Sequence, residues 1–478
     1  MSAPPVAPAP AGPIEDAGFL ESRLARLPKP GPWWLVWLLW LTVLASPMVA
    51  APWLIHGPQQ VITDFQELYG LGRTALETGR LTRESLGFYP PSAIPVYMAF
   101  ATLPPWVASW LTCGVYGLLF LLAIRHLPGE AMRVHPAQRW HAWLSLALVA
   151  GPFICYDITT GQVSGIPVFA IVMGFVWWRR GRTWAAAAAL AAGTAFKLLP
   201  GACVLFYLVK RQWRMVLATG ALTVAFMFLP GLVLFGPAGL AEGWREYHTH
   251  VSYPKSHPVE YPGRIRWTKP ASWLNPSLSI TALRWLSDYP RDDATPFLPI
   301  AHWEQTHVQW GQRALMIGLG LASLWLCRGR EQAGRRPPPG GGLDRSAATG
   351  DERDAHAVTR ATEEASWLPA NQYGLLTVWM ILLSPHLAPY YMAWALWPVA
   401  VMMGHVAWRD LYHGRVDPLN LIPLWIFALS MPVGMLTVPR GAGLHPAVLL
   451  LVWAVMAVNV LRVRRRQAEP GLANRMGA

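Results

Sequence analysis

The chain has 478 residues, of which 53% are hydrophobic and only 14% are charged. Soluble proteins carry about 25% charged residues, so this composition excludes an ordinary soluble globular protein. Several apolar runs of about 18–23 residues are long enough to cross a bilayer, and they predict an all-α polytopic membrane protein. The formal net charge of +13 lies mostly in short Lys and Arg clusters at the ends of these runs. That is the positive-inside pattern, and it argues against nucleic-acid binding.

Basic residues define the expected orientation of the apolar runs. Arg23, Arg26 and Lys29 precede the first run, at about residues 33–55, and place its start on the cytoplasmic side. Its far end puts Asp64, the first acid that follows, on the outer face. The alternation of charge continues along the chain and gives about ten full spans. After the first, they are expected at about 105–125, 141–157, 163–178, 213–235, 308–327, 367–384, 389–408, 418–438 and 445–461.

One apolar segment does not fit this alternation, because basic clusters at Arg182 and Lys210 enclose it on both sides. A single span would place positive charge on both faces of the membrane, and two full spans would need about 40 residues. Lys197 and Pro200 interrupt the segment at "KLLP". We therefore predict two short helices that enter and leave on the cytoplasmic side, broken where protein or a wet cavity satisfies the backbone. An ionisable residue at such a break is a functional candidate.

These predictions divide the chain into five parts. The stretch 328–366 contains "RRPPPGGGLDRSAATGDERDAHAVTRATEE", which is polar, of low complexity and typical of a flexible linker. The Pro- and Ala-rich N-terminus lacks a basic region, so we expect no cleaved signal peptide. The expected parts are a disordered cytoplasmic N-terminus (1–32), a first transmembrane module (33–327) with outer loops 56–104 and 236–306, the cytoplasmic linker (328–366), C-terminal transmembrane helices (367–462) and a cytoplasmic tail (463–478).

The first outer loop has the spacing of helices that lie along the membrane interface. In "DFQELYGLGRTALETGRL" one helical face can be formed by Phe65, Leu68, Leu71 and Leu76. "SAIPVYMAFATLPPW" is a second apolar piece, too short to span, and "FYPPS" breaks the chain between the two. Asp64 lies at the start of the first helix. The pattern alone favours a helix cap, with catalysis as the alternative.

Two further residues, one on the expected outer face and one in the broken segment, carry a charged group next to apolar sequence, where burying a charge is costly. Asp157 lies in "YDITTGQV", where it either caps the next helix or orients a ligand, and Gln162 is a residue type that binds sugars. Lys197 lies at the helix break. Either its aliphatic stem carries the ammonium group to the membrane surface, or the ammonium group recognises a phosphate.

The long outer loop offers other candidates of lower specificity. Arg264 and Arg266 in "YPGRIRW" suit phosphates or lipid headgroups. A metal site is conceivable from imidazoles and a carboxylate in "YHTHVSYPKSHPVEY". The spacing is weak and the segment irregular, so we expect no metal and no cofactor. The histidines and acid in question are His248, His250, His257 and Glu260.

Six elements in order resemble glycosyltransferase family 87, which comprises integral membrane enzymes of the GT-C fold. They are Asp64 after the first span, "FYPPSAIPVYMAFATLP", "GQVSG", "AFKLLPGACVLFYLVKRQWR", "NPSLSITALRWL" and "LLSPHLAPYYMAWAL". The resemblance covers about residues 60–400. In place of the Trp and paired His that this family usually carries a few residues after the "SP" of the last element, the chain has Ala388, Pro389, Tyr390 and Tyr391.

The resemblance implies a GT-C fold, with residues 33–327 as its catalytic transmembrane module, and it implies roles for particular residues. Asp64 would be the general base of an inverting transfer of a sugar, most often mannose in this family, from a polyprenyl phosphate. Arabinose and glucose stay open as alternatives. The residues expected at the donor phosphate or sugar are Lys197, Arg284, His386, Asp157 and Gln162. The residues expected at the acceptor or in loop contacts are Tyr89, Arg264, Arg266, Asn275 and Tyr390.

The sequence thus favours a glycosyltransferase of the cell (inner) membrane with its active site on the outer, periplasmic face. Its partners would be the lipid-linked donor, a lipid or glycan acceptor and membrane lipids, without nucleic acid. The alternatives are a transporter or flippase of lipid-linked sugars and a non-catalytic scaffold. A transporter should have repeated halves and charges at the bilayer midplane. The chain has no internal repeat and few carboxylates in its spans, which favours an enzyme.

Overall fold

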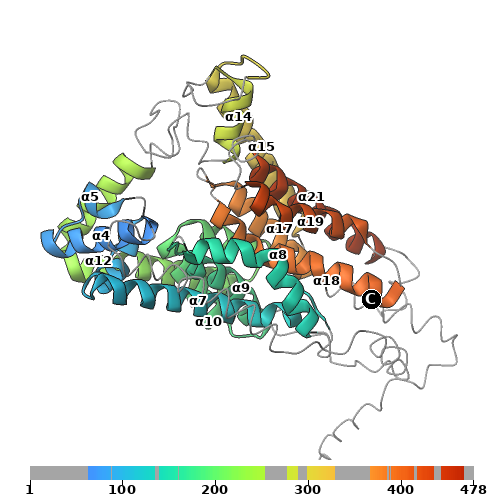
Figure 1. Ribbon diagram of the computed structural model, residues 1–478, viewed down its shortest axis with the longest axis horizontal. Helices are drawn as coiled ribbons and strands as arrows, with labels where there is room; N and C mark the ends of the chain where they lie inside the picture. Colours follow the sequence, from blue (N-terminus) through green and yellow to red (C-terminus); the bar gives the residue numbers. More distant parts are fainter. Residues whose placement is uncertain are drawn as a thin grey trace, which may run out of the picture.

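In the computed structural model, the described part of the chain is helical, and its one β-type pairing is an isolated bridge between Ser287 and Trp303 (Figure 1). The structure describes residues 63–87, 89–134, 139–159, 161–252, 277–288, 299–328, 367–384, 387, 389–413, 417–434 and 443–467. The first expected span, the N-terminal segment and nearly all of the expected linker lie outside these ranges.

The segment predicted to be the first outer loop, which keeps that name below, consists of short helical elements as far as it is described. They are α4 (Thr63–Thr78), α5 (Arg83–Leu86), the 3-10 helix η1 (Pro91–Ala93) and α6 (Ile94–Ala101). Helix α4 packs against α6, and its buried residues Leu68, Leu71 and Ala75 share a hydrophobic core with Ile94 and Tyr97 of α6. Phe65 on the same helix is also buried and belongs to the larger core of the membrane helices. The prediction that Leu76 shares this face is wrong, because Leu76 lies about 100° around the helix from Ala75 and is 40% exposed.

The longer helices follow the expected spans, and each span predicted from residue 105 onward overlaps at least one helix. They are α7 (Pro105–Glu130), α8 (Arg139–Thr159), α9 (Gly165–Arg179), α10 (Thr183–Phe196), the 3-10 helix η3 (Leu199–Cys203), α11 (Val204–Val209), α12 (Trp213–Tyr247), the π-helix η4 (His248–Ser252), α14 (Leu278–Leu286), α15 (Gln305–Leu326), α17 (Leu368–Leu382), the 3-10 helix η6 (Pro389–Ala395), α18 (Leu396–His413), α19 (Pro418–Gly434) and α21 (Leu444–Gln467).

Within the described ranges, three helices are long and apolar enough to cross a membrane. They are Pro105–Glu130, Trp213–Ser252 and Leu444–Arg465. Helix α8 adds a fourth if its two parts, which meet at 54°, count as one span. Several other helices are apolar but shorter. The expected count of about ten spans therefore stays a prediction.

The outward faces of these helices are apolar. On α12, Leu217 is 69% exposed and Val233 is 81% exposed, and on α19 Trp425 is 62% exposed. Contiguous apolar surface of this kind is disfavoured in water and is accommodated by lipid acyl chains. The chain is therefore a helical membrane protein.

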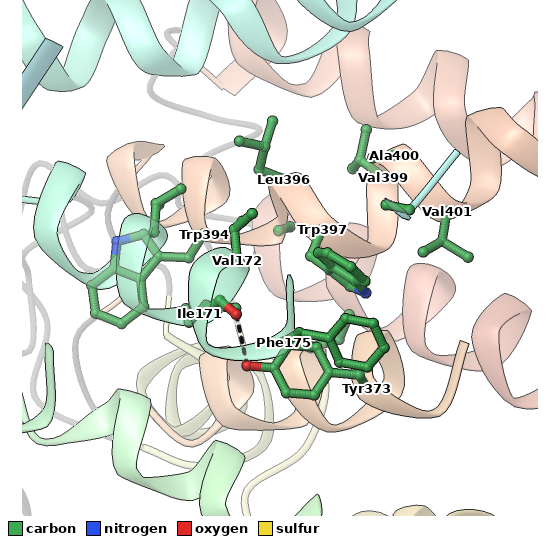
Figure 2. Packing of buried hydrophobic residues seen from close by; sticks show 14 of the residues in the cluster. Ile171, Val172, Phe175, Tyr373, Trp394, Leu396, Trp397, Val399, Ala400 and Val401 are labelled. Atoms are coloured by element: carbon green, nitrogen blue, oxygen red, sulfur yellow. Dashed lines mark hydrogen bonds between the residues drawn. The ribbon is translucent and has the colours of Figure 1, made fainter. Parts of the chain in front are cut away.

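A cluster of aromatic rings joins the central helices (Figure 2). The ring of Phe175 on α9 lies 4.5 Å from that of Trp397 on α18 and 4.7 Å from that of Tyr373 on α17, centroid to centroid. Phe206 on α11 packs edge-on against Tyr373 at 5.3 Å. The buried Tyr373 hydroxyl donates to the carbonyl of Ile171 at 2.8 Å, which satisfies its polar end. The C-terminal helices are thus part of the same core as α9 and α11.

Helices α9 and α10 approach each other unusually closely. A Cβ at Gly193 on α10 would collide with the Cβ of Ala170 on α9. The Ala-rich sequence of α10 allows this approach, because small residues let helix backbones come together and gain dispersion contacts where no hydrophobic effect drives them.

The predicted break at "KLLP" is confirmed. Helix α10 ends at Phe196, Lys197 has extended backbone angles (φ −147°, ψ 109°), and η3 begins two residues later. The break lies against the first outer loop, because the hydroxyl of the buried Ser92 in η1 donates to the carbonyl of Ala195. This bond satisfies a carbonyl in the last turn of α10, which lacks an intrahelical partner.

The long outer loop is more helical than expected. Helix α12 continues past residue 235 to Tyr247, with a kink at Gly236, whose φ of 68° and ψ of 175° suit glycine. The end of α12 packs with the first outer loop through Leu240 and Tyr247, which join a second hydrophobic core with Leu81. At the C-terminus, α21 runs to Gln467, beyond the expected end of its segment at residue 462.

Replacing Gly72 by Ala should destabilise the first outer loop. A Cβ there would collide with the Tyr97 carbonyl on α6, a backbone atom that cannot rotate away. Overpacking of this kind costs about 1–3 kcal/mol. We expect Gly72→Ala to lower the thermal unfolding midpoint in detergent by several degrees. Gly70→Ala is the matched control: nothing lies within 4 Å of its Cβ position, so it should leave the midpoint unchanged or raise it. Equal effects of the two variants would contradict this packing.

Candidate active site

Asp64 lies in the first turn of α4, where the partial positive charge of the helix N-terminus stabilises a carboxylate. It is half-buried, and its Oδ2 accepts a hydrogen bond from the side-chain Nε2 of Gln162. The chain thus brings together two candidates that are 98 residues apart in sequence. Because α4 begins at Thr63, Asp64 is inside the helix rather than at the capping position before it.

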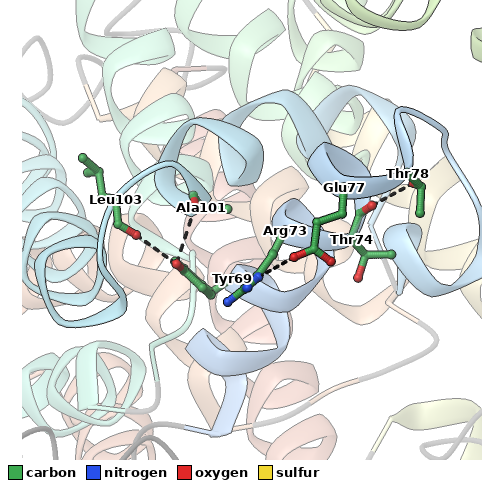
Figure 3. A network of polar contacts seen from close by, with 7 residues as sticks. All are labelled: Tyr69, Arg73, Thr74, Glu77, Thr78, Ala101 and Leu103. Atoms are coloured by element: carbon green, nitrogen blue, oxygen red, sulfur yellow. Dashed lines mark hydrogen bonds and ion pairs between the residues drawn. The ribbon is translucent and has the colours of Figure 1, made fainter.

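Polar contacts hold α4 in place (Figure 3). The Tyr69 hydroxyl donates to the carbonyl of Leu103 at 2.9 Å, just after α6. On the exposed side, Arg73 and Glu77 form an ion pair at 2.7 Å, one turn apart. The exposed pair contributes little, whereas the Tyr69 bond joins α4 to the start of the following span. The start of α4, and with it Asp64, is therefore fixed relative to the membrane helices.

Gln162 lies in the short turn between α8 and α9, and it is buried. Its backbone N–H donates to the carbonyl of Asp157 at 2.9 Å. Gly161 before it has a φ of 70°, a left-handed conformation that glycine adopts without strain. From Gly161 onward the backbone therefore has one defined path, and it directs the Gln162 amide toward Asp64.

Asp157 is fully buried near the C-terminal end of α8. The expectation that it caps the next helix is wrong, because α9 begins only at Gly165. Its carboxyl group interacts with the hydroxyl and backbone N–H of Ser164, and electrostatically with Lys197 and Asp64. A carboxylate near a helix C-terminus opposes the helix dipole, so this burial depends on the compensating groups.

Lys197 lies among three aromatic rings at the helix break. Its Nζ is 4.7 Å from the ring centroid of Tyr391, 5.4 Å from that of Trp394 and 5.8 Å from that of Tyr89. Ring faces attract a cation within about 6 Å. Tyr391 and Trp394 come from η6, so the C-terminal helices contribute directly to the surroundings of this ammonium. Neither residue was among the candidates named from the sequence, although the neighbouring Tyr390 was, because the local pattern does not show which residues of η6 lie near Lys197.

Tyr89 is buried where the first outer loop meets α10. Its ring packs edge-on against Tyr97 at 5.3 Å. Burial, followed by the nearby Tyr391 and Asp64, raises the pKa of Tyr89 well above its ordinary value. The phenol therefore keeps its proton at any physiological pH and can donate a hydrogen bond close to Asp64. Its role as an acceptor or loop contact stays a prediction.

Arg284 is not brought to this group. It is buried on α14, which packs against α15 through Leu283 and Val308. Figure 1 shows α14 at the top of the view, well separated from α4 at the left. A role for Arg284 beside Asp64 finds no support in this arrangement.

Several other candidates lie outside what the structure describes. These are Arg264, Arg266, Asn275 and His386, while Tyr390 lies in η6. Within the described ranges, no group of three or more His, Cys, Asp or Glu side chains could hold a metal ion. Of the histidines considered for a metal, His250 instead approaches Glu246 at 3.4 Å. His257 and Glu260 lie outside the described residues.

Comparison with known proteins adds one finding. The model of glycosyltransferase family 87 matches residues 88–339, just over half of the chain. The matched region contains Tyr89, Asp157, Gln162 and Lys197, and it begins after Asp64. No curated protein and no solved structure shows significant similarity to the chain. On the strength of the family match, the chain belongs to glycosyltransferase family 87.

Proposed function

We propose that this glycosyltransferase moves a sugar, with mannose as the first candidate, from a polyprenyl-phosphate donor to a lipid or glycan acceptor. The reaction takes place at the outer face of the cell membrane, within a GT-C fold, and inverts the anomeric carbon. The observation that carries the proposal is the meeting of Asp64, Asp157, Gln162 and Lys197 at one place next to the interfacial helices of the first outer loop.

Asp64 is the proposed general base. An inverting transfer needs one carboxylate opposite the leaving group, within about 3 Å of the acceptor hydroxyl. Asp64 is half-buried, and it lies at the start of a helix whose polar contacts fix its position. The bond that breaks joins the anomeric carbon to the phosphate oxygen, and the bond that forms joins that carbon to the acceptor oxygen. The acceptor proton passes to Asp64.

Lys197 is the proposed phosphate-binding cation. A lipid phosphate is already a good leaving group, so the site needs positive charge to stabilise it rather than a general acid. The ammonium of Lys197 is directed by aromatic rings and by Asp157. Asp157 then has a supporting role, because it partly balances the cation until a phosphate is present.

The donor itself favours this placement. A polyprenyl phosphate is confined to the membrane, so its sugar is presented in the plane of the interface. The elements around Asp64 and Lys197 include α4 and α6, which are amphipathic or apolar and too short to span. A base and a cation located at the membrane interface can act on the donor while its lipid stays in the bilayer.

Asp64→Asn should abolish sugar transfer. The amide keeps the shape of the carboxylate but cannot accept a proton, so turnover should fall about 100- to 10,000-fold. Membranes carrying each variant are incubated with a panel of polyprenyl-phosphate sugars, and the product is detected by mass spectrometry. The same panel identifies the sugar. Glu77→Gln removes an exposed carboxylate from the same helix and should retain normal turnover. Near-normal turnover of Asp64→Asn would rule out this base.

Lys197→Gln should weaken donor binding. A hydrogen bond that involves a charged group contributes about 1.5–3 kcal/mol, so the apparent Michaelis constant for the donor should rise about 10- to 100-fold. Lys197→Arg keeps the positive charge and should retain part of the affinity, since guanidinium also binds phosphate. Donor titrations of the two variants provide the measurement. An unchanged Michaelis constant for the donor in Lys197→Gln would exclude a phosphate-binding role.

A further inference from the structure

Gln162 and Asp64 form a contact between two separate parts of the fold. Asp64 belongs to the first outer loop, and Gln162 belongs to the turn that joins α8 to α9. A carboxylate only accepts hydrogen bonds, so the side-chain nitrogen of Gln162 must face Asp64 and its oxygen must face away. Gln162 Oε1 is buried and has no hydrogen-bond partner among the described residues. The amide therefore has one defined orientation, with one end on the proposed base.

The backbone around Gln162 restricts it further. Its N–H is bonded to Asp157 O, and the N–H of Gly161 donates to the carbonyl of Ile158 at 3.1 Å. Val163, the next residue, is fully buried in the second core with α4 and α6. Both ends of the turn are thus fixed, and little conformational freedom is left for the side chain to lose when it binds Asp64.

We propose that Gln162 is a positioning residue for the base, rather than a sugar-binding residue as its type alone suggested. Its amide holds the Asp64 carboxylate in one rotamer, with the acceptor-facing oxygen directed away from the turn. An uncharged donor suits this task, because a Lys or Arg at the same place would stabilise the carboxylate strongly and reduce its ability to take a proton. The inference rests on the proposed role of Asp64 as base.

The first test removes the amide. Gln162→Leu keeps the approximate size of the side chain but cannot donate. If Gln162 orients the base, turnover at saturating donor should fall about 10- to 100-fold, because a misplaced catalytic group costs about this much. The Michaelis constant for the polyprenyl-phosphate sugar should stay within about twofold. A raised Michaelis constant for the donor with unchanged turnover would instead assign Gln162 to sugar binding and overturn the proposal.

The second test exchanges the amide for a carboxyl group of the same shape. In Gln162→Glu, two carboxyl groups share the site and hold a proton between them until a higher pH. The acid limb of the pH–rate profile should therefore shift to higher pH, with activity recovering on the alkaline side. A purely structural role would lower turnover at all pH values without moving this limb, and that result would overturn the proposal. Because Gln162→Glu is isosteric, it remains informative if Gln162→Leu fails to fold.

Controls separate this proposal from the assignment of Asp64. Gln305→Glu makes the same exchange at the first residue of α15 and should change neither turnover nor the pH profile. In an Asp64→Asn background, Gln162→Leu should cause no further loss, because it acts only through Asp64. If Asp64→Asn is inactive while Gln162→Leu alone is normal, the positioning role fails and the base stands. If Asp64→Asn is fully active, the base itself fails, and the positioning role fails with it.

Discussion

The break between α10 and η3 is the constraint on which the candidate site depends. A helix that ends among apolar helices exposes carbonyls that neither lipid nor apolar side chains can satisfy. The chain meets this need with Ser92, which donates to the carbonyl of Ala195. That bond brings η1 onto the end of α10. Tyr97 of the adjoining α6 then packs edge-on against Phe196 at 5.6 Å, and α6 in turn supports α4. Asp64 and Lys197 are thus held at one place through a series of contacts. The series begins at the Ala195 carbonyl, which has no partner within its own helix and is bonded by Ser92.

The charges at this place are balanced differently at each helix end. Asp64 lies in the first turn of α4 and Lys197 follows the last turn of α10, so each has the sign that its helix dipole favours. Asp157 near the end of α8 has the unfavoured sign and is fully buried. A buried carboxylate in that position is kept only where other groups compensate it, here Ser164 and the cation. Of the three ionisable groups, Asp157 is therefore the one whose presence is hardest to explain by stability alone.

Local pattern was sufficient for much of the fold. Apolar runs and basic clusters predicted where the helices lie, and Lys197 with Pro200 predicted the break, because these signals act within a few residues. The errors have a common cause in longer-range geometry. Leu76 follows the buried Ala75 and lies outside the buried face of α4. Asp157 lies near the end of α8 and does not precede the first residue of α9. The resemblance selected Tyr390 of η6, but local pattern does not indicate that Tyr391 and Trp394 lie over Lys197, since that proximity arises only when α17 and α18 pack against α9.

The boundaries of the family match and of the site do not coincide, and this bears on which parts of the chain act together. The matched residues 88–339 include Gln162 and Lys197. Asp64 precedes them, and Tyr391 and Trp394 follow them. Yet Gln162 holds Asp64, and the two rings of η6 lie over the Lys197 ammonium. The candidate site therefore includes residues from both sides of the expected linker at 328–366. The helices after residue 366 position the cation, and a chain that lacked them would leave Lys197 without two of its three aromatic neighbours.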